Sequence, residues 1–169
     1  NKLKLDLNEI NTVTLTPKQF QQRILAWFKI YGRKDLPWQQ TKSPYRIWLS
    51  EIMLQQTQVA TVIPYFQNFI QAFPTLSSLA KADIEEVLHR WSGLGYYARA
   101  RNLHRSAQII EKEYFGKFPQ DLMQLQSLPG IGRTTAGAIL ALAFNKSASI
   151  LDGNVKRVLT RVHAIPGST

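Results

Sequence analysis

The sequence has no cysteine among its 169 residues. This excludes disulfide bonds, thiolate metal sites and iron–sulfur ligation by this chain. Long hydrophobic runs are also missing, since none approaches the ~20 residues that a membrane-spanning helix needs. The three histidines, His89, His104 and His163, are too scattered to indicate a metal site. No signal peptide or lipidation motif is visible, so we expect no membrane partner. Because cysteines are missing and the histidines are scattered, we also expect no metal site in this chain.

Acidic residues are scarce compared with basic ones. The chain has 11 Asp and Glu against 21 Lys and Arg, which gives a net charge of +10. Such an excess favours nucleic acid or an anionic surface as the partner. A merely soluble basic protein is the alternative that charge alone leaves open. The length allows one domain or two small lobes with a sizeable core.

A tight turn joins two apolar helical segments near residue 130. It reads Leu128-Pro129-Gly130-Ile131-Gly132, and a helix begins at Arg133-Thr134. Glycine lets the backbone bend and approach a ligand without a Cβ in the way. The first N–H groups of the helix have no intrahelical partner, so this end favours phosphate. Because no Lys-Ser/Thr follows the second glycine, we predict a polymer of phosphates rather than a nucleoside triphosphate as the ligand.

Helix signals dominate the whole chain, and no segment demands a strand. Helices start where proline follows a capping residue, at Thr16-Pro17 and Ser43-Pro44, and glycines or Gln55-Gln56-Thr57 end them. The spacing of apolar residues predicts helices over residues 16–31, 43–54, 83–91, 96–114 and 121–126, one ending at Phe73 that starts or kinks at Pro64, and others after Arg133 and Asp152. We therefore predict an all-α fold.

Glu51 is the first candidate for chemistry, because apolar residues surround it in the segment 47–54. A carboxyl near much apolar surface has a raised pKa and suits a general acid. The alternative, a surface glutamate on the polar side of an amphipathic helix, is commoner for such a pattern. For Trp38 two roles are equally compatible with the sequence: a core residue, or part of the wall of a binding pocket.

Asp152 is the second candidate, and its setting is the opposite. It precedes Gly153-Asn154 and an apolar helix, so an N-cap position and the positive helix end favour its ionised form. A plain N-cap is the commoner role. A protonated acid and a fixed carboxylate are together the pair that cleavage of a glycosidic bond needs. Spacing alone does not show that the two residues meet.

Four sequence blocks follow one another in a recognisable order. They read WLSEIMLQQTQV at 48–59, GLGYYARARNL at 93–103, LPGIGRTTAG at 128–137 and ILDGNVKR at 150–157. In this order they resemble the adenine DNA glycosylase family of the endonuclease III-like helix-hairpin-helix superfamily. The likeness covers residues 16–162. The first and last blocks are specific to the adenine-removing branch, whereas the turn alone would identify only the superfamily.

The resemblance implies a helix-hairpin-helix glycosylase fold with its site in a cleft between two lobes. We expect residues 1–15 to be a flexible lead-in and residues 16–42 to be the N-terminal helix and loop of a second lobe. Residues 43–133 would form a six-helix bundle that ends in the hairpin, and residues 134–169 would begin the second lobe.

The resemblance also assigns roles to individual residues. Glu51 matches the acid that protonates adenine at N7, and Asp152 matches the carboxylate that stabilises the sugar cation before water attacks. Gln56, with Gln55 beside it, and Tyr96 match residues that enter the duplex and support extrusion of an adenine mispaired with 8-oxoguanine or guanine.

The remaining matches concern support of the site and DNA binding. Trp38 resembles part of the adenine pocket wall, and Tyr97 and Asn154 resemble nearby support. The turn with Leu128, Gly130, Gly132 and Arg133 would hold the DNA backbone, Lys156 is expected to contact a phosphate, and the arginine-rich helix 96–114 is expected to guide the DNA.

Thr134 stands where strand-cutting members of the superfamily have a lysine that attacks the sugar. A threonine cannot form a Schiff base. The resemblance therefore implies base removal by water without efficient strand cleavage.

The family's full enzyme continues into a four-cysteine segment that binds a [4Fe–4S] cluster and then into a domain that checks the opposite 8-oxoguanine. This chain contains neither, so we interpret it as part of a longer, monomeric protein that acts on duplex DNA. Its expected location is the nucleoid of a bacterium, or the nucleus or mitochondrion of a eukaryote. Two alternatives stay open: a related thymine or uracil mismatch glycosylase, and a non-catalytic DNA-binding fragment.

Overall fold

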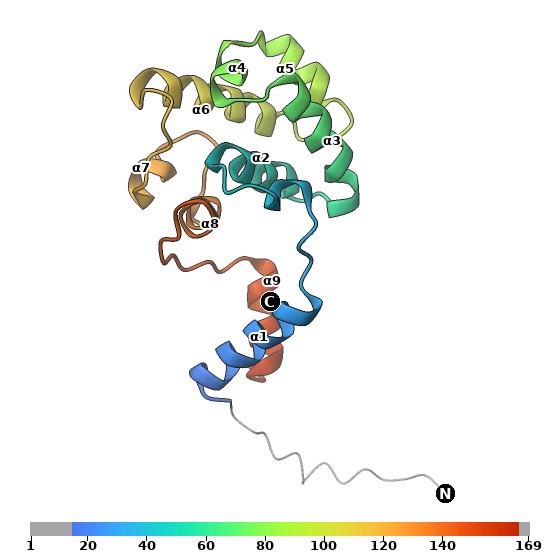
Figure 1. The fold of residues 1–169 in the computed structure, drawn as a ribbon, viewed down its shortest axis with the longest axis vertical. Coiled ribbons are helices and arrows are strands. Elements are labelled where there is room, and N and C mark those ends of the chain that lie inside the picture. Colours follow the sequence, from blue (N-terminus) through green and yellow to red (C-terminus); the bar gives the residue numbers. More distant parts are fainter. Residues whose placement is uncertain (1–14, 166–169) are drawn as a thin grey trace, which may run out of the picture.

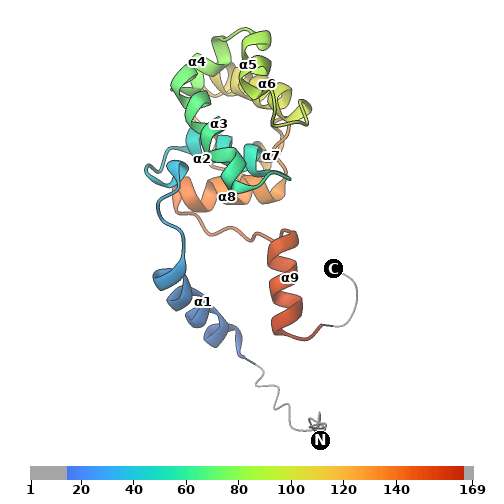
Figure 2. The ribbon, with the colours of Figure 1, turned by 90° about the vertical axis from the view of Figure 1, so that its right-hand side faces the viewer.

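All regular structure within residues 15–165, the part of the chain that the computed structural model describes, is helical (Figures 1 and 2). The elements are α1 Pro17–Tyr31, the short 3-10 turn η2 Pro37–Gln39, α2 Pro44–Leu54, α3 Val59–Ala72, α4 Leu76–Lys81, α5 Ile84–Trp91, α6 Ala98–Glu113, α7 Leu122–Gln126, α8 Arg133–Phe144 and α9 Gly153–Val162. The predicted all-α fold is confirmed. The predicted lead-in lies outside the described residues, apart from Leu15.

The predicted helix starts are confirmed by their caps. The Thr16 side chain accepts a hydrogen bond from the N–H of Gln19, and the Gln19 side chain accepts one from the N–H of Thr16. Ser43 caps α2 in the same way through the N–H of Arg46. In each case a side-chain oxygen satisfies an N–H that has no partner within the helix, and proline at the first position loses no helical bond.

The structure decides the start of one predicted helix and adds a helix that was not predicted. The helix expected to start or kink at Pro64 begins five residues earlier, at Val59, and continues through the proline. A proline this close to the helix start removes only one hydrogen bond, so the tertiary packing of α3 overrides it. The short helix α4 was not predicted at all; Thr75 and Ser78 cap it, and its six residues are too few to show a clear apolar period.

Helix α2 lies at the centre of the bundle (Figure 1). It contacts α3 and α6 on one side and α8 on the other. Trp48, Leu49 and Met53 of α2 are fully buried, and they join a core that includes Phe66 and Trp91 from the neighbouring helices. Burying side chains of this size is the main term that stabilises the bundle, at roughly 1.5–3 kcal/mol for each.

Helices α1 and α9 lie apart from the bundle, at the lower end of the molecule (Figures 1 and 2). Neither has a buried residue. They meet through Phe20 and His163, whose ring centres are 5.8 Å apart, and through an apolar pocket between Ile24 and Val158. These contacts pack the two helices against each other. None of the described helices is both long and apolar enough to cross a membrane.

Candidate active site

Glu51 projects from the central helix α2 into a recess of the protein. Seven of the 11 residues of α2 are buried, whereas Glu51 is half-buried and borders two pockets. A helix buried on nearly all sides has no polar face. The alternative of a surface glutamate on an amphipathic helix therefore does not describe Glu51, because its carboxyl lies in a recess of the protein.

The surroundings of Glu51 change its acidity. Burial raises the pKa of the Glu51 carboxyl above its ordinary value, and the nearby carboxylate of Asp152 raises this pKa further. Both effects disfavour the ionised form, the first by removing water and the second by repulsion between like charges. A carboxyl with a raised pKa keeps its proton closer to neutral pH, which is the property that a general acid needs.

Asp152 is the N-cap of α9. Its Oδ1 accepts a hydrogen bond of 2.7 Å from the N–H of Val155, and the side chain is half-buried. The plain capping role expected for such a residue is therefore present. It does not exclude a second role, because the cap fixes the carboxylate at the positive end of the helix, where it points into the same recess as Glu51.

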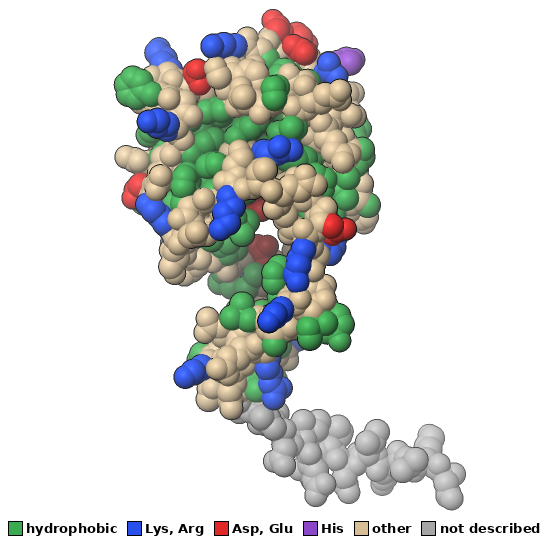
Figure 3. Space-filling view, viewed as in Figure 1, with side chains coloured by type: hydrophobic (Ala, Val, Ile, Leu, Met, Phe, Trp, Pro, Cys, Tyr) green, Lys and Arg blue, Asp and Glu red, His purple; other side chains and the backbone are tan. Residues whose placement is uncertain are grey.

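A single cavity of about 810 Å³ is bordered by both carboxyl groups. Its walls come from the end of α2 and the loop that follows, the start of α3, and the first turns of α8 and α9. A hollow is visible between the bundle and the lower helices, and Lys and Arg side chains lie around it on this face (Figure 3). Four other predicted site residues also line the cavity: Gln55, Gln56, Thr134 and Asn154.

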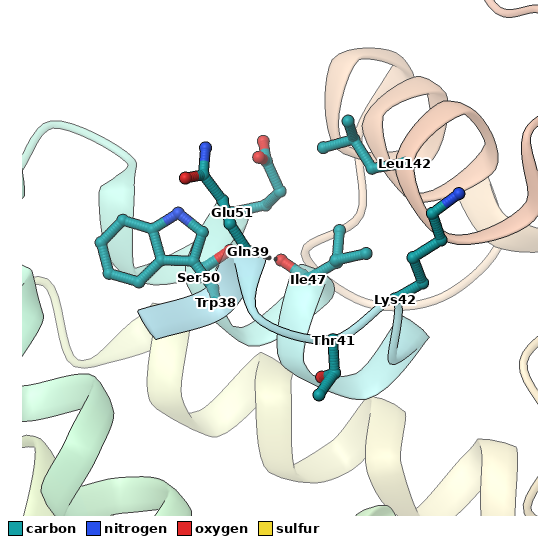
Figure 4. A pocket seen from close by; sticks show the side chains of 8 residues that line it. All are labelled: Trp38, Gln39, Thr41, Lys42, Ile47, Ser50, Glu51 and Leu142. Carbon is teal, nitrogen blue, oxygen red and sulfur yellow. Dashed lines mark hydrogen bonds between the residues drawn. The ribbon is translucent and has the colours of Figure 1, made fainter. Parts of the chain in front are cut away.

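A smaller pocket of about 330 Å³ adjoins the cavity and shares Glu51 with it. Trp38, Gln39 and Glu51 lie on one side of this pocket, and Leu142 and Lys42 lie on the other (Figure 4). Trp38 is only 7% exposed and packs edge-on against Phe66 at 5.4 Å. The two roles considered for Trp38 are thus compatible, since one face of the ring joins the core and another faces the pocket.

Gln56 and Tyr96 occupy exposed loops with unusual backbone conformations. Their φ angles are +57° and +50°, in the left-handed region that residues with a side chain rarely adopt. Tyr96 is 66% exposed. The neighbouring Tyr97 donates from its hydroxyl to Ser92 Oγ at 3.4 Å and does not line the cavity. Because Tyr96 is left-handed, α6 begins at Ala98 and not at Tyr96 as the sequence pattern had suggested.

The turn between α7 and α8 has the geometry of a tight hairpin. The N–H of Ile131 donates to Leu128 O at 3.1 Å, and Gly130 has a φ of +76°. A Cβ on Gly130 would lie 2.9 Å from the Cβ of Asn102, so close packing also requires glycine there. Gly132 is different, because open space surrounds it and no side chain caps α8. The first N–H groups of α8 are therefore accessible to an anion.

Several predicted DNA-contacting residues lie outside the cavity. Leu128 is only 3% exposed, so a ligand at that point can reach its backbone but not its side chain. Arg133 and Lys156 are exposed at the starts of α8 and α9. In the arginine-rich helix α6, Arg101 is exposed, whereas Arg99 turns inward and bonds to backbone carbonyls. Arg99 is thus not free to guide DNA, contrary to the expectation for that helix.

The structure adds site residues that the sequence did not single out. Arg157 lines the main cavity and donates from Nη2 to Asn154 Oδ1. Arg157 belongs to the sequence block at 150–157 and lies three residues after Asn154 on the same helix. This spacing could have identified it from the sequence. Lys42 and Leu142 border the small pocket, and nothing in the sequence could have indicated them. Their positions depend on how α8 packs against α2.

The described residues hold no group of three or more His, Cys, Asp or Glu side chains that could bind a metal ion. The sequence has no cysteine, so this chain supplies no thiolate for the [4Fe–4S] cluster expected from the resemblance. The residues present do not fit such a cluster.

The fold and the hairpin define an all-α helix-hairpin-helix protein of the kind found in DNA glycosylases. A thermostable thymine-DNA glycosylase superposes with a TM-score of 0.79 and 30% sequence identity, covering 85% of this chain and 66% of that one. An endonuclease III–DNA complex superposes with a TM-score of 0.71 at 24% identity, over 85% of this chain and 67% of that one, which supports the fold alone.

Residues 49–169 match the family described as HhH-GPD superfamily base excision DNA repair protein, and the chain belongs to this family. It is 54% identical over 153 residues to an adenine DNA glycosylase of Buchnera aphidicola subsp. Acyrthosiphon pisum, across 90% of this chain and 44% of that protein. It is 46% identical over 162 residues to the adenine DNA glycosylase of Homo sapiens, across 89% and 30%. The chain thus spans less than half the length of these relatives.

Proposed function

We propose that the protein is a single-function DNA glycosylase that removes adenine mispaired with 8-oxoguanine or guanine by hydrolysing the N-glycosidic bond. The observation that carries this proposal is the shared cavity of Glu51, whose pKa is raised, and Asp152. The names of the relatives support adenine as the base. The hairpin and the net charge of +10 support duplex DNA as the partner, and we propose that the protein acts as a monomer.

Extrusion of the base comes first, because an enzyme cannot reach an atom inside a stacked duplex. Gln56 borders the cavity, and Tyr96 lies exposed on a loop joined to the Gln55–Gln56 loop by hydrogen bonds to a shared arginine. Side chains that enter the duplex fill the space left by the extruded base and offset the lost stacking. The small pocket with Trp38 and Glu51 would then receive the adenine.

Bond cleavage follows by proton transfer. Glu51 donates its proton to N7 of adenine, the C1′–N9 bond breaks, and its electron pair leaves with the neutral base. The positive charge that develops on the sugar is stabilised by the carboxylate of Asp152. Water then adds to C1′ and gives a proton to the Glu51 carboxylate, which restores the acid. The products are free adenine and an abasic site.

Thr134 supports hydrolysis without strand cleavage. It lies half-buried in the first turn of α8 and borders the cavity. A threonine hydroxyl cannot form the Schiff base through which an amine would cut the strand. A repair enzyme of this kind acts where the genome is, in the bacterial cytoplasm or in the nucleus or mitochondrion of a eukaryote.

The test is release of free adenine by the full-length protein from a duplex with adenine opposite 8-oxoguanine. Loss of a general acid lowers a rate by about 10²- to 10⁴-fold, so we expect Glu51→Gln to reduce single-turnover release by at least about 100-fold. Glu86→Gln, the same change at an exposed residue of α5, is the matched control and should leave the rate unchanged. A Glu51→Gln rate within a fewfold of the wild-type rate would overturn the assignment.

A thymine or uracil mismatch glycosylase is the second candidate, and the superposition on a thymine-DNA glycosylase favours it. Protonation by Glu51 favours adenine instead, because N7 protonation assists a purine as the leaving group. A panel of duplexes with A·8-oxoguanine, A·G, T·G and U·G mismatches separates the two. Binding to duplex without release of any base would indicate a non-catalytic DNA-binding fragment.

A further inference from the structure

Arg99 is half-buried between two loops, although it belongs to a helix rich in exposed cations. Its Nη1 donates to three carbonyl oxygens at the end of α2, those of Ile52 at 3.0 Å, Met53 at 2.9 Å and Gln55 at 2.6 Å. Its Nη2 donates to Thr57 Oγ1 at 3.3 Å and to the carbonyl oxygens of Leu94 at 3.2 Å and Gly95 at 3.3 Å. One guanidinium thus joins the loop after α2 to the loop before α6.

Aromatic rings complete the surroundings of Arg99. Its Cζ lies 5.4 Å from the centre of the Trp91 ring and 5.6 Å from the centre of the Tyr96 ring. Trp91 is fully buried, and its Nε1 donates to Gly95 O at 3.2 Å, which adds a second hydrogen bond to the same loop. Carbonyl oxygens at the end of a helix and the faces of aromatic rings both attract a cation.

The two loops carry the exposed side chains proposed to enter the duplex. Gln56 follows Gln55, whose carbonyl bonds to Arg99, and Tyr96 follows Gly95, whose carbonyl also does. Gln56 and Tyr96 are both left-handed residues. Such conformations cost free energy and persist only where the surroundings over-determine them. Arg99 is the group that both loops share.

We propose that Arg99 is a positioning residue that holds Gln56 and Tyr96 in fixed relative positions, so that both enter the duplex together during extrusion of the adenine. This inference rests on the function proposed above. Arg99 does not face the cavity and touches no reacting atom; it acts through the two loops. Arginine suits the task because its rigid, planar fork carries five donors and stays charged. A lysine ammonium has three donors on one atom and cannot reach both sets of acceptors.

A role in extrusion predicts that Arg99 matters most when the adenine is stacked. An adenine in a three-nucleotide bubble is already unstacked and needs less help. We therefore expect Arg99→Lys in the full-length protein to slow single-turnover adenine release by about tenfold or more from a duplex paired on both sides of A·8-oxoguanine. The same variant should lose less than about threefold on the bubble substrate, because the unstacking cost there is small.

A matched control and a double substitution make the test specific. Arg90→Lys, at an exposed arginine of α5, should leave both rates unchanged. In a variant that already carries Gln56→Ala and Tyr96→Ala, adding Arg99→Lys should cost little more, because the side chains that Arg99 positions are gone. If the role of Arg99 were purely structural, Arg99→Lys would instead lower the rate equally on both substrates. Its effect would also add to that of the double alanine substitution.

The outcomes are distinguishable. Equal loss on paired and bubble substrates, or additivity with the two alanine substitutions, would overturn the proposal for Arg99. If Arg99→Lys does not fold, as judged by circular dichroism and melting temperature, Thr57→Val takes its place, because it removes only one acceptor of Arg99. Thr57→Val should slow release more from the paired duplex than from the bubble, by a smaller factor than expected for Arg99→Lys. An equal loss for Thr57→Val on the two substrates, relative to the wild type, would then overturn the proposal. Absence of adenine release by the wild-type protein from either substrate would refute the proposed function instead.

Discussion

The two carboxyl groups of the candidate site differ in what surrounds them. Glu51 and Asp152 border one cavity, yet their surroundings differ. Glu51 stands on a helix that is buried on nearly all sides, and both burial and Asp152 raise its pKa. Asp152 instead accepts a backbone N–H at the start of a helix. Two residues of similar chemistry are thereby suited to opposite tasks, proton donation and stabilisation of a cation.

The Glu51 carboxyl should titrate above the ordinary range of glutamate in the full-length protein. Because only the protonated form donates, adenine release should decline as the pH rises through this raised pKa. Asp152→Asn should lower the pKa of Glu51 without returning it to the ordinary value, since burial is the larger cause and remains. NMR of ¹³C-labelled glutamate measures both titrations. An unchanged Glu51 titration in Asp152→Asn would mean that the carboxyl groups do not interact.

At the scale of helices, Asp152 has two separable roles. Asn caps a helix about as well as Asp, whereas Ala costs about 0.5–2 kcal/mol. We therefore expect Asp152→Ala to lower the free energy of unfolding by about that amount and Asp152→Asn to leave it nearly unchanged, as urea denaturation would measure. Both substitutions should abolish adenine release, because both remove the charge. Retention of activity by Asp152→Asn would reduce Asp152 to a plain cap.

The two hairpin glycines should also differ in whether they matter for stability or for DNA binding. Gly130→Ala should destabilise the protein by about 1–2 kcal/mol or more, because a left-handed conformation costs this much for a residue with a Cβ, and because Asn102 occupies the space. Gly132→Ala should cost only about 0.5 kcal/mol, since glycine is modestly better than alanine at an N-cap.

For DNA binding we expect the opposite order, with a larger effect of Gly132→Ala than of Gly130→Ala. A Cβ on Gly132 would enter the open space beside the first N–H groups of α8, so Gly132→Ala should weaken binding several-fold. The measurement combines thermal unfolding with binding titrations in the Glu51→Gln background, where the duplex stays intact. Unaltered binding by Gly132→Ala would indicate that no phosphate approaches this turn.

At the scale of the whole molecule, the charge of +10 should govern the proposed association with DNA. Affinity for duplex should fall linearly with salt on logarithmic axes, with a slope of about −0.9 for each phosphate contacted. Arg133→Gln and Lys156→Gln should each weaken binding to any sequence and reduce the slope by about 1. Lys81→Gln on α4, outside the proposed interface, is the control. A slope identical to that of the wild type would exclude a phosphate contact for the residue concerned.

Local signals allowed much of the fold to be predicted. Capping residues such as Thr16 and Ser43 mark helix starts because they satisfy N–H groups within three residues of themselves. Glycine at position 130 marks the hairpin for a similarly local reason, its left-handed conformation. Sequence patterns were insufficient where packing decided, because they left the start of α3 open and did not indicate α4.

The sequence by itself determined the all-helical class and the hairpin turn. Its excess of basic residues favoured a polyanion as the partner, and its resemblance to a family indicated Glu51 and Asp152 as the two acids. Only the tertiary structure decided that Glu51 lies on a helix with no polar face, and that it shares a cavity with Asp152. It also decided that Arg99 turns inward to join two loops. The reason is physical: capping and turn geometry act between neighbours in the chain, whereas burial, charge repulsion and multiple hydrogen bonds depend on which distant segments pack together.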